Sequence, residues 1–263
     1  MLENSLFAET YAIFGRWMRK TLRQPMFLFF SLVQPIVWFI LFTQSFSQIS
    51  KIPGFAALTG TDSYLTYFSA AVLIQTVISS AMQSGLGLVQ DMDSGYLDKM
   101  RVAPIRRFSI LTGKVMSDGV RIFIQSLIIM ILGLALGVTV ITGIGGFVLI
   151  LLIAAAFGVV WSGISMFIAL ATRNSEATLM ISLLTTFPLL FLSTAVMPKP
   201  FLPDWVQTVA TYNPMSYIAD AFHTLIIHGV DWVVLGQASL IIGAIGVVTL
   251  AGTTAMFRRA VFR

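Results

Sequence analysis

The sequence predicts an all-α polytopic membrane protein with six transmembrane helices. The chain has 263 residues, of which 57% are hydrophobic and only 10% are charged. Residues 122–172 include no Asp, Glu, Lys or Arg. This stretch is long enough for two spans joined by a turn at 142–146, because one helix needs about 20 residues to cross a bilayer core. A soluble domain needs charge on its outer helix faces and rarely contains such a stretch.

Six largely uncharged stretches are long enough to cross a membrane, and we expect them to form one transmembrane domain over residues 1–263. A chain of this length has too few remaining polar residues to cover six such helices in a soluble core. The expected spans are residues 26–46, 64–89, 120–140, 147–171, 179–196 and 233–257.

The distribution of basic residues predicts the orientation of these spans. An even number of spans places both termini on one side, and of the 16 Lys and Arg residues only Lys51 and Lys199 fall on the other. By the positive-inside rule we expect both termini in the cytoplasm and the chain in the plasma (inner) membrane. The first apolar stretch begins only at Met26, after several charged residues, so we expect no cleaved signal peptide.

The net charge of +5 is best explained by this topology. No basic face is interleaved with stacking aromatic residues, so we expect no nucleic acid among the partners. The chain has no cysteine, which excludes disulfides, thiol catalysis and Cys-based metal sites.

Residues 5–23 have the pattern of an amphipathic helix that lies in the membrane interface. Apolar side chains recur every three or four residues, and basic residues recur on the opposite side of the same helix. We expect the apolar side in the headgroup region and the basic side against anionic lipid or an acidic partner. The apolar positions are Phe7, Tyr11, Phe14, Met18 and Leu22, and the basic ones are Arg16, Lys20 and Arg23.

The loop at residues 91–104 is predicted to contain a short helix. Asp93 and Ser94 can cap it, Leu97 and Met100 share one face, and Pro104 helps to end it. One or two helical turns are not stable alone, so a partner protein that receives the helix would explain it. A charged loop that only orients the spans is the alternative, and the residues leave both open. The expected contacts are the apolar anchors Tyr96, Leu97 and Met100 and the rim residues Lys99 and Arg101.

Residues 197–232 are apolar but cannot form a span. Three prolines interrupt the first part, Asn213-Pro214 separates two short helices, and Gly229 closes the second at about 14 residues. We therefore expect a re-entrant or interfacial hairpin on the external side. Trp205, Tyr212, Tyr217 and Trp232 are placed where an outer aromatic belt would lie.

Together these segments resemble the permeases of type 2 ATP-binding-cassette (ABC) transporters, and among them the daunorubicin-resistance type of drug and lipid exporter. The resemblance covers essentially the whole chain, and four blocks agree in order and spacing. They are Leu22-Arg23-Gln24-Pro25 with Pro35; Asp91, Gly95, Leu97, Pro104, Gly113 and Lys114; the Pro-rich residues 197–205; and residues 212–217, Tyr-Asn-Pro-Met-Ser-Tyr.

The resemblance implies a six-helix half-transporter that pairs with a second, identical permease chain and with two ABC ATPase subunits. Residues 91–101 would be the helix that couples to the ATPase, and residues 5–23 the interface helix beside it. The implied coupling residues are Asp91, Asp93, Gly95, Tyr96, Leu97, Lys99, Met100 and Arg101, and those of the interface helix are Arg16, Lys20, Arg23 and Pro25.

The chain itself is not expected to be an enzyme. It has no phosphate-binding Gly-x-x-x-x-Gly-Lys-Ser/Thr loop, because Gly113-Lys114 lacks the earlier glycine and is followed by Val115. ATP and Mg would therefore be bound by the partner ATPase, and we expect no cofactor or metal in this chain.

The external hairpin departs from the family pattern at His223, where relatives often carry an arginine. Asp220 lies at helical spacing from it, so the two could form a pH-sensitive pair. A buried structural histidine is the alternative and is favoured on general grounds. The hairpin residues singled out are Trp205, Asn213, Pro214, Asp220 and His223.

The polar groups within the spans are mostly uncharged, which suits an apolar or amphipathic cargo such as a drug, lipid or glycolipid and argues against an ion relay. They include Gln34, Gln75, Gln83 and Gln125, with Asp118 and Arg121 paired at the cytoplasmic mouth of the third span. A permease for polysaccharide, lipid-linked glycan or sodium stays open as an alternative within the superfamily. An intramembrane enzyme is a weaker one, because both histidines fall in the external hairpin. Export, as the direction, follows from the resemblance alone.

Overall fold

The computed structural model describes the backbone of residues 6–102 and 105–262, and not the side chains of residues 27, 28, 30, 98, 101, 102, 107, 108 and 258–262. Every regular element in these ranges is helical, as the sequence predicts. The long helices are α1 (Leu6–Leu22), α2 (Pro25–Ser45), α4 (Tyr64–Asp93), α6 (Arg107–Ala135), α7 (Gly143–Thr172), α8 (Ser175–Phe191) and α11 (Trp232–Phe262), and the short ones are α3 (Phe55–Thr59), α5 (Tyr96–Val102), α9 (Asp204–Tyr212) and α10 (Pro214–His223).

Four helices in the described part are long and apolar enough to cross a membrane. These are α4, α7, residues Ser109–Ala135 of α6 and residues Trp232–Phe257 of α11. Helices α2 and α8 contribute the shorter apolar stretches Ser31–Ser45 and Ser175–Phe191. That the chain crosses the membrane six times therefore remains a prediction, because it requires α2 and α8 to be spans as well.

The limits of α6 differ from the expected third span, residues 120–140. The helix begins at Arg107 and ends at Ala135, and Gly137 follows with φ +105°. Glycine adopts this left-handed conformation without a steric penalty, which explains why the helix stops there. As a result Lys114 and Asp118 belong to the first turns of a long helix and not to a loop.

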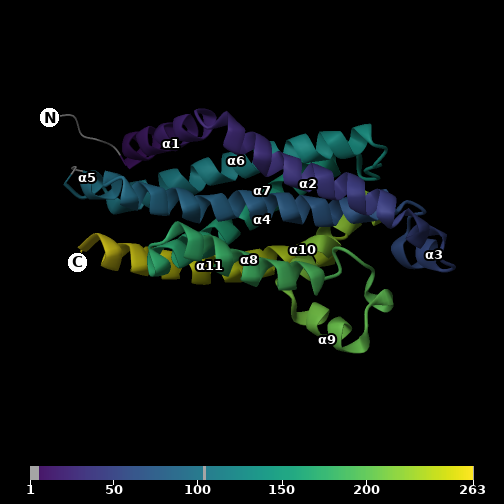
Figure 1. Ribbon diagram of the computed structural model, residues 1–263. Coiled ribbons are helices and arrows are strands. Elements are labelled where there is room, and N and C mark those ends of the chain that lie inside the picture. Colours follow the sequence, from purple (N-terminus) through teal and green to yellow (C-terminus); the bar gives the residue numbers. More distant parts are fainter. Residues whose placement is uncertain (1–5, 103–104, 263) are drawn as a thin grey trace.

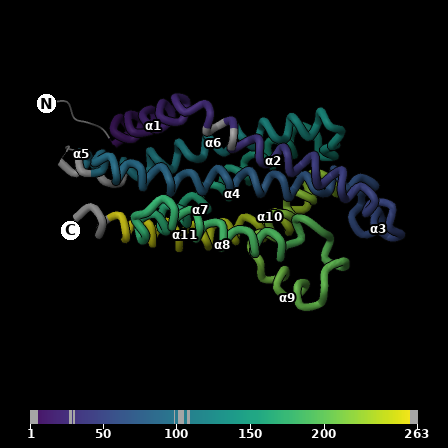
Figure 2. The backbone as a smooth tube through the Cα atoms, viewed as in Figure 1, coloured from purple at the N-terminus to yellow at the C-terminus, as the bar shows by residue number. Residues whose placement is uncertain are grey.

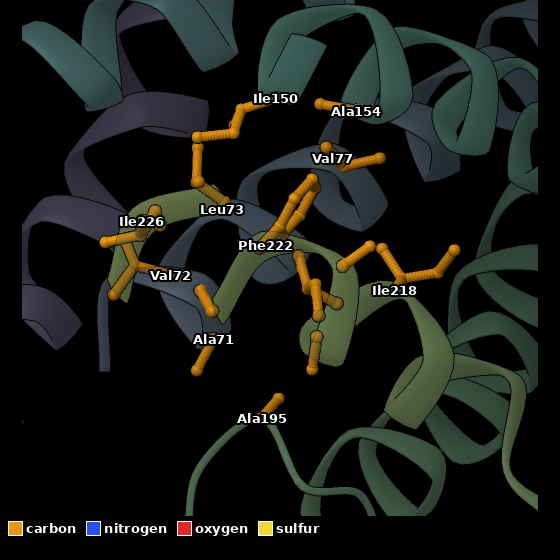
Figure 3. Packing of buried hydrophobic residues seen from close by; sticks show 14 of the residues in the cluster. Ala71, Val72, Leu73, Val77, Ile150, Ala154, Ala195, Ile218, Phe222 and Ile226 are labelled. Atoms are coloured by element: carbon orange, nitrogen blue, oxygen red, sulfur yellow. The ribbon is translucent and has the colours of Figure 1, made fainter. Parts of the chain in front are cut away.

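Helix α4 is the centre of the bundle and packs against α2, α6, α7, α8 and α10. Most of its side chains are buried. At one level Leu73 and Val77 of α4 meet Ile150 and Ala154 of α7, and Phe222 of α10 fills the space beside them (Figure 3). The short hairpin helix α10 is thus part of the main core.

The two ends of the bundle carry different elements (Figure 1). Helices α1 and α5 and the C-terminal end of α11 gather at one end, which we call the α5 end. Helices α3 and α9 lie at the opposite end, which we call the α9 end, and the backbone trace shows the same separation (Figure 2). This arrangement agrees with an even number of passages through the bundle.

Helix α1 lies against the first half of α6. The contact is close because Gly113 has no side chain: a Cβ there would be 2.8 Å from the backbone oxygen of Thr10. Ile13 and Trp17 of α1 are buried, whereas Phe7 and Tyr11 are exposed. The exposed pair agrees with a helix that presents aromatic side chains to a membrane interface.

Candidate functional site

The α5 end is held together by a carboxylate that joins α1 to α4. Asp91, near the end of α4, is buried. Its Oδ2 lies 2.8 Å from Nη1 of Arg16, and its Oδ1 lies 2.8 Å from Nζ of Lys20. Lys20 also donates to the backbone oxygen of Gly87 at 3.3 Å. The basic side of α1 thus finds its acidic partner within this chain.

Arg16 extends the connection from α1 to α5. Its guanidinium carbon lies 3.3 Å from the ring centroid of Tyr96, the first residue of α5. A guanidinium over an aromatic ring is attracted by the ring's electron-rich face. One side chain therefore contacts both Asp91 and Tyr96, so α1, α4 and α5 are linked. We call Arg16, Lys20, Asp91 and Tyr96 the bracket.

Leu97 and Met100 face the bundle, although the sequence suggested that they face a partner. They are 5% and 7% exposed. They belong to an apolar cluster at the α5 end that includes Trp17 of α1, Leu88 of α4 and Phe257 of α11. Their shared face, which was predicted, anchors α5 to its own chain because α4 and α11 offer it apolar surface.

Polar residues lie on the outward side of this segment. Asp93, Ser94 and Lys99 are exposed. Asp93 is the last residue of α4, and Gly95, with φ +66°, makes the turn between α4 and α5. A Cβ at Gly95 would meet no atom within 4 Å, so the turn is open on its outer side. The side chain of Arg101 lies outside the description.

The remaining interface residues mark the junction between α1 and α2. Arg23 is exposed and its backbone N–H donates to the oxygen of Arg19 at 3.0 Å. Pro25 is the first residue of α2. Proline suits this position because its missing N–H would have no partner in the first turn.

The sequence places Glu9 on the polar side of the helix at residues 5–23, but it does not predict the contacts of this carboxylate. Its Oε2 accepts hydrogen bonds from the backbone N–H of Arg106 at 3.0 Å and from Oγ of Ser109 at 2.9 Å. A carboxylate that accepts N–H bonds at the beginning of a helix caps that helix and complements its dipole. Glu9 thereby fixes the start of α6 to α1, and nothing in the local sequence indicates a contact across about 100 residues.

A buried group of charges lies next to the bracket, in the first half of α6. Asp118 Oδ1 lies 2.9 Å from Nη2 of Arg121, as the sequence predicts, and Asp118 Oδ2 lies 3.0 Å from Nζ of Lys114. Ser84 of α4 donates to the same carboxylate. Arg121 donates to the backbone oxygen of Ser80 at 2.9 Å. The spacing of four residues between Lys114 and Asp118 was the signal that sequence analysis did not use.

At the α9 end, Asn213 connects the end of α8 to the beginning of α10. Its Oδ1 accepts from the N–H of Met215 at 2.9 Å, so it is the N-cap of α10. Its Nδ2 donates to the oxygens of Leu189 at 2.6 Å and Leu192 at 2.9 Å. Pro214 is the first helical residue, as expected for this turn. Trp205 of α9 is exposed.

Asp220 and His223 have separate partners. His223 is buried, its Nε2 lies 3.1 Å from the backbone oxygen of Tyr67, and its ring stacks on that of Tyr67 at 4.1 Å. Asp220 accepts from Oγ1 of Thr194 at 2.8 Å. Burial lowers the pKa of His223 to about 4, so the imidazole is neutral at physiological pH. These contacts favour a structural histidine over the pH-sensitive pair.

A cavity of about 280 Å³ lies between α2, α4 and α8. Within the described part, Oε1 of Gln75, Oε1 of Gln83 and Oγ1 of Thr186 are buried without a hydrogen-bond partner. Such atoms are available to a ligand that carries donors. The lining is Ser31, Gln34, Gln75, Ile78, Ser79, Met82, Gln83, Leu86, Leu179, Leu183, Thr186 and Phe187, and none of these residues is charged.

The match to a family model decides which family this arrangement belongs to. Residues 8–227 match the model of the ABC-2 type transporter. The chain belongs to the ABC-2 type transporter family. This range begins in α1 and ends after α10, so it includes the bracket, the buried charges and the cavity.

The proteins to which the chain is similar agree with this assignment. The ABC-2 chain is 31% identical over 225 residues to a putative transport permease, ycf38, of Cyanophora paradoxa, covering 84% of this chain and 74% of that one. It is 28% identical over 205 residues to a daunorubicin resistance ABC transporter permease of Streptomyces coeruleorubidus, covering 78% and 70%. A probable doxorubicin resistance ABC transporter permease of Mycobacterium tuberculosis is 21% identical over 156 residues, covering 59% and 56%.

Proposed function

We propose that this chain is the transmembrane subunit of an ATP-driven exporter that moves a hydrophobic or amphipathic molecule out across the plasma membrane. Two identical permease chains would work with two separate ABC ATPase subunits, which would bind ATP and Mg. The family and the names of the drug-resistance relatives support this proposal. Both termini would then be cytoplasmic, and the α5 end would face the ATPase.

The observation that carries the proposal is the bracket at the α5 end. Arg16 contacts Asp91 and Tyr96 at once, so a push on α5 reaches α1 and the central helix α4 together. Leu97 and Met100 add apolar contacts that keep α5 from moving independently. Short elements attached in this way move as rigid bodies, and closure of an ATPase pair would reorient the bundle through them.

The contact surface for the ATPase would be the polar outer side of α5 and the preceding turn. Asp93, Ser94 and Lys99 are exposed there. Leu97 and Met100 are already buried, so their side chains would pack behind this surface, inside the chain, and would not contact the partner. Recognition would then depend more on charge and shape than on apolar anchors.

The cavity between α2, α4 and α8 supports an uncharged or amphipathic cargo. Its lining combines apolar side chains with amide and hydroxyl groups. A sodium route would need acidic groups, and this lining has none. Gln75 and Thr186 would accept hydrogen bonds from hydroxyl or amine groups of the cargo.

The experiment that tests this function uses the chain expressed together with a candidate ABC ATPase subunit. The double variant Asp93→Lys with Lys99→Glu should reduce copurification of the ATPase and its ATP turnover, because it reverses two exposed charges at the contact. The matched control is Lys51→Glu with Asp62→Lys, which makes the same exchanges at exposed positions of the α9 end. If the first variant keeps wild-type copurification and turnover, this surface does not receive the ATPase.

A further inference from the structure

Among the described residues of the α5 end, two buried carboxylates are paired with four cations, of which Lys114 and Arg121 are buried and Arg16 and Lys20 are partly exposed. Two carboxylates are each shared by two cations, so each group of three has a net charge of +1. Glu9 does not correct this, since it is engaged with the start of α6. Charges inside proteins are normally paired, because an unpaired charge loses its hydration. The groups are Arg16–Asp91–Lys20 and Lys114–Asp118–Arg121.

Both groups meet at one small pocket between α1, α4 and α6. Lys20, Lys114 and Arg121 line it. Trp17 lines it too, with Nζ of Lys114 4.0 Å from its ring centroid. Trp17 is 5% exposed, and its Nε1 has no hydrogen-bond partner in the described part of the chain. The pocket therefore combines surplus cations with a buried donor that has no acceptor, as an anion site requires.

The pocket is not closed off from the surface. Lys20 and Gln24 also line an open cavity of about 480 Å³ beside Arg16, Arg19 and Arg23. The pocket itself measures about 30 Å³ and shares Lys20 and Gln24 with the larger open cavity. Gln83, on the inner wall, has an unpartnered Oε1 that can accept from a hydroxyl group.

We propose that this pocket binds the phosphate group of an anionic lipid headgroup from the adjacent leaflet. Lys20, Arg121 and Trp17 Nε1 provide donors for the phosphate oxygens, and Gln83 suits a headgroup with hydroxyls, such as phosphoglycerol. Lys114 and Arg121 of the pocket belong to the first half of the apolar stretch Ser109–Ala135 of α6, so lipid would lie beside the pocket if this stretch crosses the membrane. The site requires neither the ATPase nor the cargo, so it does not depend on the function proposed above.

The test titrates purified full-length chain in neutral detergent with phosphatidylglycerol and counts bound lipid by native mass spectrometry. Trp17→Phe keeps an aromatic ring and the net charge of the chain but removes the N–H donor. It should weaken lipid binding about tenfold, as expected for the loss of a hydrogen bond to a charged group. Lys20→Gln should weaken it about fivefold and leaves Asp91 paired with Arg16. Thermal unfolding of each variant checks that it is folded.

Lys99→Gln is the matched control, because Lys99 is exposed at the same end of the bundle and lines neither of the two spaces. Its affinity should change less than twofold. Phosphatidylcholine should bind more weakly than phosphatidylglycerol. If millimolar inorganic phosphate competes with the lipid, the pocket is an anion site that also accepts phosphate from solution. Equal binding by wild type, Trp17→Phe and Lys20→Gln would overturn the proposal, whichever lipid is used.

Discussion

The two ends of the bundle are stabilised by different chemistry. At the α5 end, ion pairs and cation–π contacts join α1, α4, α5 and α6. At the α9 end, neutral side chains bond to backbone oxygens: Asn213 to Leu189, Tyr67 to Thr194, and Thr142 to Leu225. Neutral bonds of this kind fix loops with little dependence on salt, whereas ion pairs near the surface respond to ionic strength and to new charged partners.

This difference fits the roles proposed for the two ends. Contacts that must change when a partner binds are better made from charges that can exchange partners. Contacts that hold the helices α9 and α10 in place are better made from bonds that leave no buried polar group unsatisfied. The comparison therefore predicts that substitutions at the α5 end alter coupling, and that those at the α9 end alter stability alone. The exception is Asp118, whose complete burial ties it to stability as well.

The largest effect on stability is expected from Asp118→Leu. It would leave Lys114 and Arg121 buried without their shared carboxylate. Breaking a buried ion pair in this way costs about 3–5 kcal/mol. Thermal unfolding of the purified chain in detergent measures the change. Asp204→Leu serves as the control at an exposed position of the α9 end, and an equal shift for both variants would contradict the importance assigned to the buried group.

Asn213→Ala should be the most destabilising single change among the neutral contacts of the α9 end. It removes the cap of α10 and leaves the oxygens of Leu189 and Leu192 without this donor. We expect a loss of about 2 kcal/mol. Asn174→Ala, which removes only an exposed cap on α8, should cost about 1 kcal/mol or less. The same unfolding measurement distinguishes them, and a larger effect at Asn174 would contradict the account.

Arg16→Lys tests whether the bracket depends on more than charge. Lysine can still pair with Asp91, but it cannot lie flat on Tyr96 while doing so. We expect about 1 kcal/mol less stabilisation of α5. Amide hydrogen exchange in residues 96–100 should therefore become several times faster. Arg19→Lys, on the exposed side of α1, should leave this exchange unchanged. If Arg16→Lys also leaves the exchange unchanged, the cation–π contact does not stabilise α5.

The smallest effect concerns pH at the α9 end. His223 has a pKa of about 4 when folded, below its ordinary value of 6.5. The unfolded chain therefore binds more protons between these values, and stability falls as pH falls from about 6.5 toward 4. At pH 6 the expected loss is about 1 kcal/mol relative to pH 8. His223→Gln should flatten this dependence, and an unaltered pH profile in that variant would assign the effect to other groups.

Much of the architecture follows from local patterns in the sequence. Uncharged stretches predicted the long helices, and Asn213-Pro214 predicted the turn before α10, because these signals depend on neighbouring residues. The direction of Leu97 and Met100 could not be predicted in this way. Their shared face is visible in the sequence, but whether it meets α11 or a partner depends on tertiary packing.

Contacts between distant residues were also beyond sequence analysis. Arg16 and Asp91 are 75 residues apart, and Glu9 reaches the start of α6 across about 100. Each residue on its own is compatible with many partners. The pairing of Asp118 with Arg121 could be predicted from the sequence, because residues three positions apart in one helix lie side by side.

The central claim is that the bracket transmits force between the ATPase and the bundle, and Asp91→Asn tests it most directly. This variant removes the charge that holds Arg16 and Lys20 while leaving the exposed surface of α5 unchanged. In proteoliposomes containing the permease and its ATPase, we predict normal copurification of the ATPase and a loss of cargo-stimulated ATP turnover of about tenfold, from about 1.4 kcal/mol of lost coupling. Asp204→Asn, with the same chemical change at the α9 end, should behave as wild type. Wild-type stimulation in Asp91→Asn would contradict the account.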